Sequence, residues 1–335
     1  MLPSVISSLI GEDLTKVDLH LKSLLESDNS LISQIGNYIC QSGGKRVRPI
    51  LLLLSARMAG CQNPQAGDGY RGQRERAIHL ASIIEFIHAA TLLHDDVIDN
   101  ANLRRGNPSA NQKWGNQLPV LVGDYLYATS FYLLVKDRDT RIMEAVSSAT
   151  ATVTDGEILQ LQKTGDLGIR EEEYIEIIAK KTSCLMAASC RIGALLGGVS
   201  EEQVEALHAY GTDVGIAFQL VDDLLDYVSH TETIGKPVNN DLQGGNCTLP
   251  LIRTLQVASS KEIDRIRQVL SQPVYSPEDV AWIVSLIKTY GADKFTLDRA
   301  AWYVRQAKER LAVFADSAYR QALLDFSDYI VQRDF

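Results

Sequence analysis

The sequence has few cysteines, little aromatic content and no excess of positive charge, and each shortage excludes a class of protein. The five cysteines are scattered, without a Cys-x-x-Cys pair or a Cys/His spacing that binds zinc, so we expect ordinary thiols in a reducing compartment. Lys and Arg (33) are outnumbered by Asp and Glu (42), which argues against a nucleic-acid-binding protein that relies on a general basic surface.

Long apolar runs and linker-like stretches are also missing. No apolar run approaches the roughly 18 to 20 residues of a membrane span, and the N-terminus lacks a cationic region followed by an apolar one. We therefore expect a cytoplasmic protein without a transmembrane segment. No stretch rich in Pro, Gly or Ser divides the chain, so residues 1–335 are expected to form a single domain.

Apolar residues recur at three- and four-residue spacing along most of the chain, whereas the alternation typical of strands is almost absent. This pattern predicts helices over residues 5–25 and around Pro49, and Ser200 and Ser276 are predicted to cap two more. Turn residues predict loops at 60–72, 105–108 and 230–247. The expected fold is all-α, a bundle of about ten helices around a central cavity.

One acidic pattern occurs twice, as Asp-Asp-Val-Ile-Asp at 95–99 and as Asp-Asp-Leu-Leu-Asp at 222–226. In a helix the first and last Asp of each motif lie one turn apart and project from the same face. Two such faces opposed across a cavity would bind hard cations, and carboxylate oxygens favour magnesium or manganese over zinc or copper. Because Mg²⁺ usually binds through one or two carboxylates plus substrate phosphates, the pair of motifs indicates a diphosphate site.

Local cationic clusters can meet an anionic ligand in spite of the net charge of -9. The loop Gly-Gly-Lys-Arg-Val-Arg at 43–48 offers exposed amides, and Arg48 offers a bidentate fork for phosphate. Further clusters occur at 104–105 and 180–181. For any one cluster alone, a solvated helix end or loop is an equally good interpretation.

Two histidines accompany the first acidic motif. His88 lies two helical turns before Asp95 and is expected to face the same cavity, although a lone His is more often a satisfied core residue. His94 faces elsewhere on the helix and is expected to be structural.

Three ordered motifs resemble the signature of the trans-isoprenyl diphosphate synthases. They are Gly-Gly-Lys-Arg-Val-Arg-Pro at 43–49, the first acidic motif followed by Leu-Arg-Arg-Gly at 103–106, and Phe-Gln-Leu-Val at 218–221 before the second acidic motif. The resemblance covers residues 30 to 255 approximately, and it is closest to the long-chain, octaprenyl-like polyprenyl diphosphate synthases.

The resemblance implies an activity. Such enzymes condense isopentenyl diphosphate head to tail, in trans, with an allylic diphosphate (geranyl, farnesyl or geranylgeranyl) and release diphosphate. It also implies a homodimer, and the long apolar product is expected to pass to a membrane.

The resemblance further implies a role for each matching residue. Isopentenyl diphosphate would be bound by Lys45, Arg48, His88 and Arg105. The allylic diphosphate would be bound by Arg104, Lys181, Thr182, Gln219 and Lys236, of which Lys181, Thr182 and Gln219 are the expected catalytic residues. Magnesium or manganese would be bound by Asp95, Asp99, Asp222 and Asp226, with Asp96 and Asp223 in support. Asn246 stands where many relatives have a third allylic-side lysine, although some long-chain relatives have Asn there too.

This chemistry is mainly electrostatic. Ionising an allylic diphosphate builds negative charge on the leaving group, which fixed cations stabilise, and a carbocation on carbon. The carbocation must be kept dry, beside apolar walls and dipoles such as those of Lys181, Thr182 and Gln219. The released diphosphate is a suitable base for the final proton.

Product length is expected to depend on the helix of the first acidic motif. Thr91 lies one turn before Asp95 with Ala90 beside it, so both are placed to line a channel for the growing tail. Neither is bulky, whereas relatives that make short products often have an aromatic there. We therefore expect a product of roughly heptaprenyl to nonaprenyl length, around octaprenyl. The floor of the channel is assigned to Phe131, Leu133 or Leu134, for which a plain core role is the commoner one.

Two alternatives remain at this point. A class I terpene cyclase ionises a diphosphate on a similar fold, but its second metal motif typically mixes Asn, Ser or Thr with Glu. A non-catalytic partner subunit would keep the fold, but such partners usually lose the acidic motifs that this chain retains.

Overall fold

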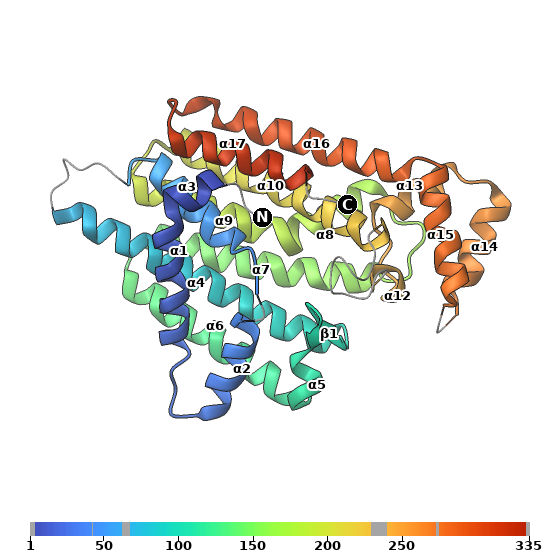
Figure 1. Cartoon of the computed structure of the whole chain (residues 1–335), viewed down its shortest axis with the longest axis horizontal. Coiled ribbons are helices and arrows are strands. Elements are labelled where there is room, and N and C mark those ends of the chain that lie inside the picture. The colour runs from blue at the N-terminus through green and yellow to red at the C-terminus, as the bar shows by residue number, and fades with distance from the viewer. Residues whose placement is uncertain (1–3, 42, 62–67, 229–239, 273–274, 333–335) are drawn as a thin grey trace. The chain divides into compact units, whose positions relative to one another are not determined.

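The structure is a computed structural model of the chain, and it describes residues 4–41, 43–61, 68–228, 240–272 and 275–332. Figure 1 shows that nearly all of them are helical. The only sheet among these residues is a two-stranded antiparallel hairpin of β1 (Leu103–Arg104) and β2 (Asn107–Pro108). The expected all-α fold is therefore confirmed, and short helices such as α5 (Ala110–Trp114) and α12 (Asn240–Gln243) raise the number of helices above expectation.

The chain forms two compact units, each built from several segments. Unit 1 comprises Met1–Thr150, Leu185–Gly211 and Arg310–Phe326, and unit 2 comprises Ala151–Cys184, Thr212–Glu309 and Ser327–Phe335. Helices α7 (Thr140–Lys163) and α10 (Glu201–Val228) contribute to both units. The single domain expected for residues 1–335 stays a prediction.

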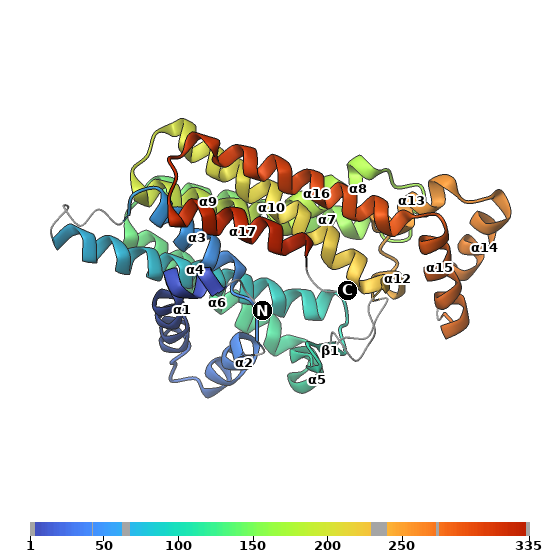
Figure 2. The same cartoon turned by 45° about the horizontal axis from the view of Figure 1, so that its top comes forward.

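Helix α4 (Asp68–Ile98) is the centre of the N-terminal part of unit 1. It packs against α1 (Ser4–Leu24), α2 (Ser30–Gln41), α3 (Val47–Met58), α5 and α6 (Gln117–Asp137). Figures 1 and 2 both show α6 lying alongside α4. Because neighbours surround α4, its apolar residues are buried around the whole helix, as at Leu80, Ile84, Phe86 and Ile87.

Unit 2 contains a local change in helix type. Helix α8 (Glu171–Ile178) runs into the π-helical turn η2 (Ala179–Ser183), and the helix then continues as α9 (Cys184–Gly197). The remaining helices of the C-terminal half are α13 (Leu249–Val257), α14 (Ser260–Leu270), α15 (Pro277–Thr289), α16 (Ala292–Arg310), the short 3₁₀ turn η3 (Leu311–Val313) and α17 (Ala318–Val331).

Most predicted helix boundaries are confirmed. Helix α1 matches the segment predicted over 5–25, and Pro49 lies in the first turn of α3. Ser200 and Gln203 form the expected reciprocal capping bonds, and the Ser276 hydroxyl accepts a bond from the Asp279 N–H at 3.1 Å.

The three predicted loops need correction. Helix α4 already begins at Asp68, so the loop predicted over 60–72 is too long. Residues 105–108 belong to the hairpin, in which Arg105 (φ 52°) and Gly106 (φ 78°) adopt the left-handed conformation of a tight turn. The loop predicted over 230–247 contains α12, and residues 229–239 lie outside the described part of the chain.

Among the described residues, two helices are long and apolar enough to span a membrane when length and composition alone are considered. The segment Gly72–Ile98 is 72% buried within the protein, which explains its apolar composition as that of a core helix. The segment Gln117–Asp137 is only 33% buried, and its exposed apolar residues need another explanation.

Candidate functional site

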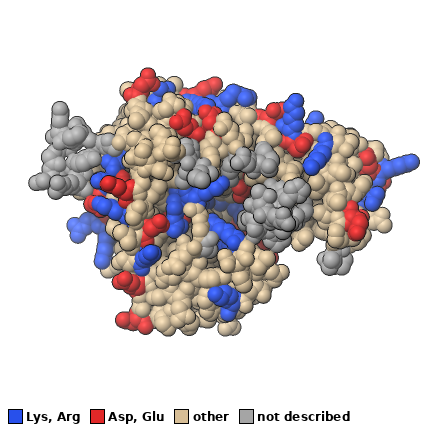
Figure 3. Space-filling view, in the orientation of Figure 1, with Lys and Arg blue, Asp and Glu red and all other residues tan. Residues whose placement is uncertain are grey.

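The loop before α3 places the first cationic cluster in unit 1. Arg46 has a left-handed backbone (φ 49°), and its guanidinium donates to Asp18 (2.9 Å), to Glu85 (2.9 Å) and to the Cys40 carbonyl (3.0 Å). These bonds make Arg46 an anchor of the loop, whereas Lys45 is exposed and Arg48 half-buried. Figure 3 shows Lys and Arg side chains gathered where Figure 1 draws the segment between α2 and α3.

Two more predicted residues, Arg105 and His88, lie close to this loop. A Cβ atom on Gly44 would come within 3.1 Å of the Arg105 guanidinium, so Arg105 lies directly over the glycine. His88 is half-buried on α4, and burial lowers the pKa of its imidazole well below the usual value, with the nearby charges of Arg48, Arg105 and Arg104 lowering it further. Unit 1 therefore brings His88, Arg48 and Arg105 together, in surroundings that favour the neutral imidazole.

The first acidic motif ends α4, and its three aspartates differ in environment. Asp95 is half-buried and Asp99 is exposed just beyond the helix. Asp96 is fully buried, where it accepts a 2.6 Å bond from Arg104 Nε and a 3.4 Å bond from the Ala110 N–H. Asp96 thus fixes the hairpin and α5 to the end of α4, and its supporting role at a metal site stays a prediction.

In unit 2, the second acidic motif is organised around Asp223. Asp222 and Asp226 are half-buried, and Asp223 is buried. Both oxygens of Asp223 accept short hydrogen bonds, one from the Tyr174 hydroxyl (2.5 Å) and one from the Gln219 amide (2.6 Å). Burial raises the pKa of Asp223 to about 7, although these two hydrogen bonds oppose the shift.

The same network reaches the predicted catalytic residues. The Thr182 hydroxyl lies 2.9 Å from Gln219 Oε1, to which it donates, so Thr182, Gln219, Asp223 and Tyr174 form one chain of hydrogen bonds. Their donors and acceptors alternate, which fixes the orientation of the Gln219 amide.

The segment after the second motif folds back on it. The Asp241 N–H donates to Asp226 at 2.9 Å, and the Asn246 N–H donates to the Asp241 carbonyl at 2.8 Å. Burial raises the pKa of the Asp241 carboxyl well above its usual value, and the carboxylates of the second motif raise it further. Lys236, expected to bind the allylic diphosphate, lies outside the described residues.

The adjacent lysines of the π-turn have different partners. Lys181 Nζ lies 2.7 Å from the buried carboxylate of Glu157 on α7. Lys180 pairs instead with Asp155 (2.9 Å) and Glu176 (2.7 Å). The charge of Lys181 also acts on the Asp241 carboxyl, which follows the second acidic motif, and its role in allylic binding stays a prediction.

The residues expected to set product length lie on α4 and α6. Ala90 is completely buried, and Thr91 is half-buried with its hydroxyl bonded to the His88 carbonyl at 2.8 Å. On α6, Phe131 and Leu133 are half-buried and Leu134 is buried. His94 has the structural role expected of it, because it stacks on Tyr127 (5.7 Å between ring centroids) and so joins α4 to α6.

Sequence reasoning missed several residues of these surroundings. They are Glu157, Tyr174 and Asp241. Each acts through a partner that is distant in sequence or belongs to the backbone, so no local motif could identify it. Asp241 alone had a weak signal, since it is an acidic residue in the segment that follows the second motif.

The carboxylates were tested as possible metal ligands. Within the described residues, no group of three or more His, Cys, Asp or Glu side chains forms a site for a metal ion. The donors near each motif are hard carboxylate oxygens, which fit a divalent ion that binds through one or two of them and takes its remaining ligands from substrate phosphates and water. The donor chemistry therefore fits a divalent metal ion held together with a diphosphate.

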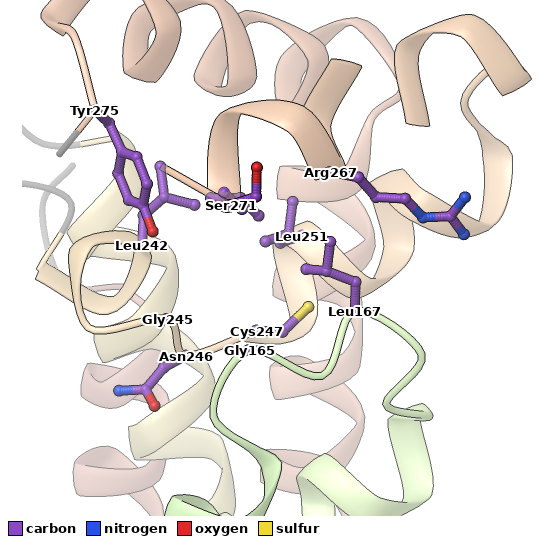
Figure 4. A pocket seen from close by; sticks show the side chains of 11 residues that line it. Gly165, Leu167, Leu242, Gly245, Asn246, Cys247, Leu251, Arg267, Ser271 and Tyr275 are labelled. Carbon is purple, nitrogen blue, oxygen red and sulfur yellow. The ribbon is translucent and has the colours of Figure 1, made fainter. Parts of the chain in front are cut away.

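Unit 2 also contains a pocket of about 150 Å³, shown in Figure 4. Its walls come from the segment after α7, the turn after α12, and helices α13 and α14, and they include Leu167, Leu242, Cys247 and Leu251. Arg267 extends away from the other labelled side chains in Figure 4. The pocket is lined by none of the predicted catalytic or metal-binding residues, but its lining includes Asn246, whose N–H bonds the Asp241 carbonyl.

Comparison with solved structures defines the class of fold. The polyprenyl synthase of Caulobacter crescentus CB15, solved with calcium and isoprenyl diphosphate, matches 98% of this chain and 97% of its own, with a TM-score of 0.92 and 36% identity. The fold is thus that of the polyprenyl synthases, the all-α isoprenoid synthase fold.

Sequence comparison then defines the family. The polyprenyl synthetase model matches residues 29–287, and the chain belongs to this family. The octaprenyl diphosphate synthase of Escherichia coli (strain K12) is 36% identical over 98% of both chains. The short chain isoprenyl diphosphate synthase of Methanothermobacter thermautotrophicus is 35% identical over 95% of this chain and 92% of its own. The protein is accordingly a prenyltransferase that elongates prenyl diphosphates in trans.

Proposed function

We propose that this prenyltransferase condenses isopentenyl diphosphate with an allylic primer, geranyl, farnesyl or geranylgeranyl diphosphate, up to about octaprenyl length. The observation that carries the assignment is the grouping in unit 1 of Arg48, Arg105 and His88 beside the glycine loop. Such a group offers two bidentate forks and a hydrogen-bonding imidazole to one diphosphate. Exposed Lys45 adds a positive charge, and this set binds isopentenyl diphosphate.

The allylic diphosphate is assigned to Lys181, Thr182 and Gln219 in unit 2, together with Arg104 and Lys236. The hydrogen-bonded chain from Thr182 to Asp223 supports this assignment, because it presents fixed dipoles beside Lys181. Fixed dipoles stabilise developing charge without having to reorganise during the reaction.

Magnesium ions would be held by Asp95, Asp99, Asp222 and Asp226. When bound, magnesium supplies positive charge that stabilises the leaving diphosphate. Asp223 is assigned to orientation instead of metal binding, since both of its oxygens accept hydrogen bonds from Tyr174 and Gln219. Asp96 is assigned a similar supporting role through Arg104.

The assignment is tested with the purified chain, farnesyl diphosphate, labelled isopentenyl diphosphate and magnesium. We expect turnover by the chain alone, loss of turnover with a chelator, and products of about eight isoprene units in the mass spectrum. Turnover that required a second protein would contradict the proposal and favour a partner subunit.

The neighbouring lysines provide a matched pair for the allylic site. Lys181→Ala is expected to raise the KM for farnesyl diphosphate about tenfold or more, because a charge-assisted bond contributes about 1.5 to 3 kcal/mol. Lys180→Ala should leave that KM unchanged, since Lys180 pairs with Asp155 and Glu176. Equal effects of the two substitutions would contradict the assignment.

Product length is tested on α4. Thr91→Phe is preferable to Ala90→Phe, because Ala90 is completely buried and a ring there would overpack the core. If Thr91 lines the channel, Thr91→Phe gives shorter products, whereas Leu92→Phe, one position along the helix, does not. Unchanged product length in Thr91→Phe would refute the channel assignment.

A homodimer is proposed from the exposed face of α6. Leu121, Tyr132 and Val135 are 62%, 60% and 58% exposed, and their spacing places them on one side of the helix. A second copy of the chain that covers this face explains the low burial of an apolar helix. Leu121→Glu with Val135→Glu should convert a dimer to monomers in sedimentation experiments, whereas Leu19→Glu on α1 should not. We place the enzyme in the cytoplasm and expect it to pass its apolar product to a membrane.

A further inference from the structure

The π-helical turn η2 lies where the proposed allylic-site residues begin. The Cys184 N–H bonds to the Ala179 carbonyl, five residues earlier, so the turn contains one residue more than an α-helical turn. Without this extra residue, everything after it would be rotated by about 100° relative to α8. Such turns are rare and often occur at functional sites.

Two glycines from neighbouring helices contact the backbone of this turn. A Cβ atom on Gly156 of α7 would lie 2.5 Å from the Lys181 nitrogen, and one on Gly215 of α10 would lie 2.6 Å from the Ser183 Cα. Both obstacles are backbone atoms, which cannot turn aside as the end of a side chain can. Only glycine therefore allows α7 and α10 to approach the π-turn so closely.

Each residue from 181 to 183 is also held by a side-chain bond. Lys181 pairs with Glu157 (2.7 Å), the Thr182 hydroxyl donates to Gln219 (2.9 Å), and the Ser183 hydroxyl donates to the Thr212 carbonyl (2.7 Å). Thr212, Gly215 and Gln219 follow one another at three- and four-residue spacing, so one face of α10 holds the turn.

We propose that Gly156 and Gly215 are positioning residues, which hold the π-turn so that Lys181 and Thr182 meet the allylic diphosphate in a productive orientation. Neither glycine contacts the substrate, and each acts through the backbone of the turn. This inference depends on the proposed role of Lys181 and Thr182 in allylic binding. It adds that the shape of the turn, and not only the identity of its side chains, sets that binding.

The test compares Gly215→Ala with Gly211→Ala. A Cβ atom on Gly211 would lie 2.7 Å from the Ala187 Cα, so both substitutions on α10 produce a similar backbone clash, but only Gly215 faces the π-turn. We expect both variants to unfold at lower temperature than the wild type. Gly215→Ala alone should lower kcat/KM for farnesyl diphosphate by about 100-fold, the effect typical of a shift of about 1 Å in a positioned group. The KM of Gly215→Ala for isopentenyl diphosphate should stay within about twofold of the wild-type value. A smaller fraction of folded enzyme leaves KM unchanged, so lost stability alone would not alter the KM for either substrate.

Binding of the unreactive analogue farnesyl thiodiphosphate, measured by calorimetry, gives a readout that does not require turnover. It should weaken in Gly215→Ala and not in Gly211→Ala. If the two variants show the same loss of stability and the same kinetics, the inference is wrong.

A second pair decides the question if Gly215→Ala does not fold. Ser183→Ala removes the bond to Thr212 without adding atoms, and Ser189→Ala removes a comparable buried bond to the Leu185 carbonyl within α9. We expect only Ser183→Ala to raise the KM for farnesyl diphosphate. If the wild type is active and the two serine variants do not differ, the inference about the π-turn is wrong but the proposed function stands. If the wild type itself is inactive, the proposed function is wrong.

Discussion

The surroundings of His88 disfavour the protonated, positively charged form of its imidazole. Burial and the guanidiniums of Arg48 and Arg105 lower the pKa of the His88 imidazole. Below about pH 6.5, the usual pKa of histidine, the unfolded chain therefore binds a proton that the folded protein does not. The unfolded state then binds more protons, and the free energy of unfolding must fall as the pH is lowered below about 6.5.

Urea unfolding of wild type and His88→Gln between pH 7.5 and 5 tests this effect on the free energy of unfolding. We expect the wild type to lose up to about 1.4 kcal/mol more per pH unit than the variant, which has no titrating group at this position. Parallel pH dependences for the two proteins would show that His88 is not held neutral.

The sequence predicted the individual residues that carry a recognisable chemical group in an ordered motif. His88, Arg48 and Arg105 were expected to act together, and unit 1 places them together. Tyr174 was not predicted, because its bond to Asp223 joins residues 49 positions apart and a tyrosine among acidic residues has no distinctive spacing. Arg46 belongs to a predicted cationic motif, yet its bonds to Asp18 and Glu85 make it an anchor and not a ligand.

At the scale of elements, the contact between α4 and α6 depends on a glycine. A Cβ atom on Gly123 of α6 would overlap the His94 ring, which is itself held by the Val120 carbonyl at 3.2 Å and by Tyr127. The ring therefore cannot move aside without breaking these contacts. Gly11 on α1 has no atoms within 4 Å of a Cβ position, so it lacks such a constraint.

Alanine substitutions at these two positions should have opposite effects on stability. Gly123→Ala is expected to destabilise the protein by about 1 to 3 kcal/mol through overpacking. Gly11→Ala should stabilise it by about 0.5 to 1 kcal/mol, because Ala loses less backbone entropy than Gly in a helix interior. Chemical denaturation of both variants measures the difference, and destabilisation of equal size would contradict this account of the α4–α6 contact.

Helices could be predicted from apolar spacing, but changes within a helix could not. The pattern across residues 171–197 is continuous, and nothing in it marks the extra residue of the π-turn. That turn depends on Gly156 and Gly215, which come from other helices and approach its backbone only in the folded protein. The start of α4 at Asp68 was missed for a different reason, since the preceding Gly and Pro residues favour a loop.

At the scale of the whole molecule, overall similarity does not determine product length. An octaprenyl diphosphate synthase and a short chain isoprenyl diphosphate synthase are 36% and 35% identical to this chain, over nearly the same extent. Overall identity therefore does not assign a product length to this chain. Our proposal therefore assigns product length to the small side chains of Ala90 and Thr91 and not to membership of the family.

The two acidic motifs belong to different units, and the last prediction concerns whether they act on one diphosphate. Asp95→Asn and Asp222→Asn should each reduce kcat/KM for the allylic substrate. If the two motifs bind the same diphosphate, the second substitution should lower kcat/KM by less in the single variant than in the wild type. The loss of transition-state stabilisation in the double variant should then differ from the sum of the single losses by about 1 kcal/mol or more.

The control for this cycle is Asp95→Asn combined with Gly211→Ala, which should be additive to within about 0.5 kcal/mol because the two sites share no partner in the proposed mechanism. Additive losses in the aspartate pair as well would mean that each motif binds its own ion independently. Non-additivity confined to the aspartate pair would instead identify Asp95 and Asp222 as parts of one ionisation site. Two carboxylates that stabilise the same leaving group do not contribute independently to kcat/KM, because removing either one reduces the contribution of the other.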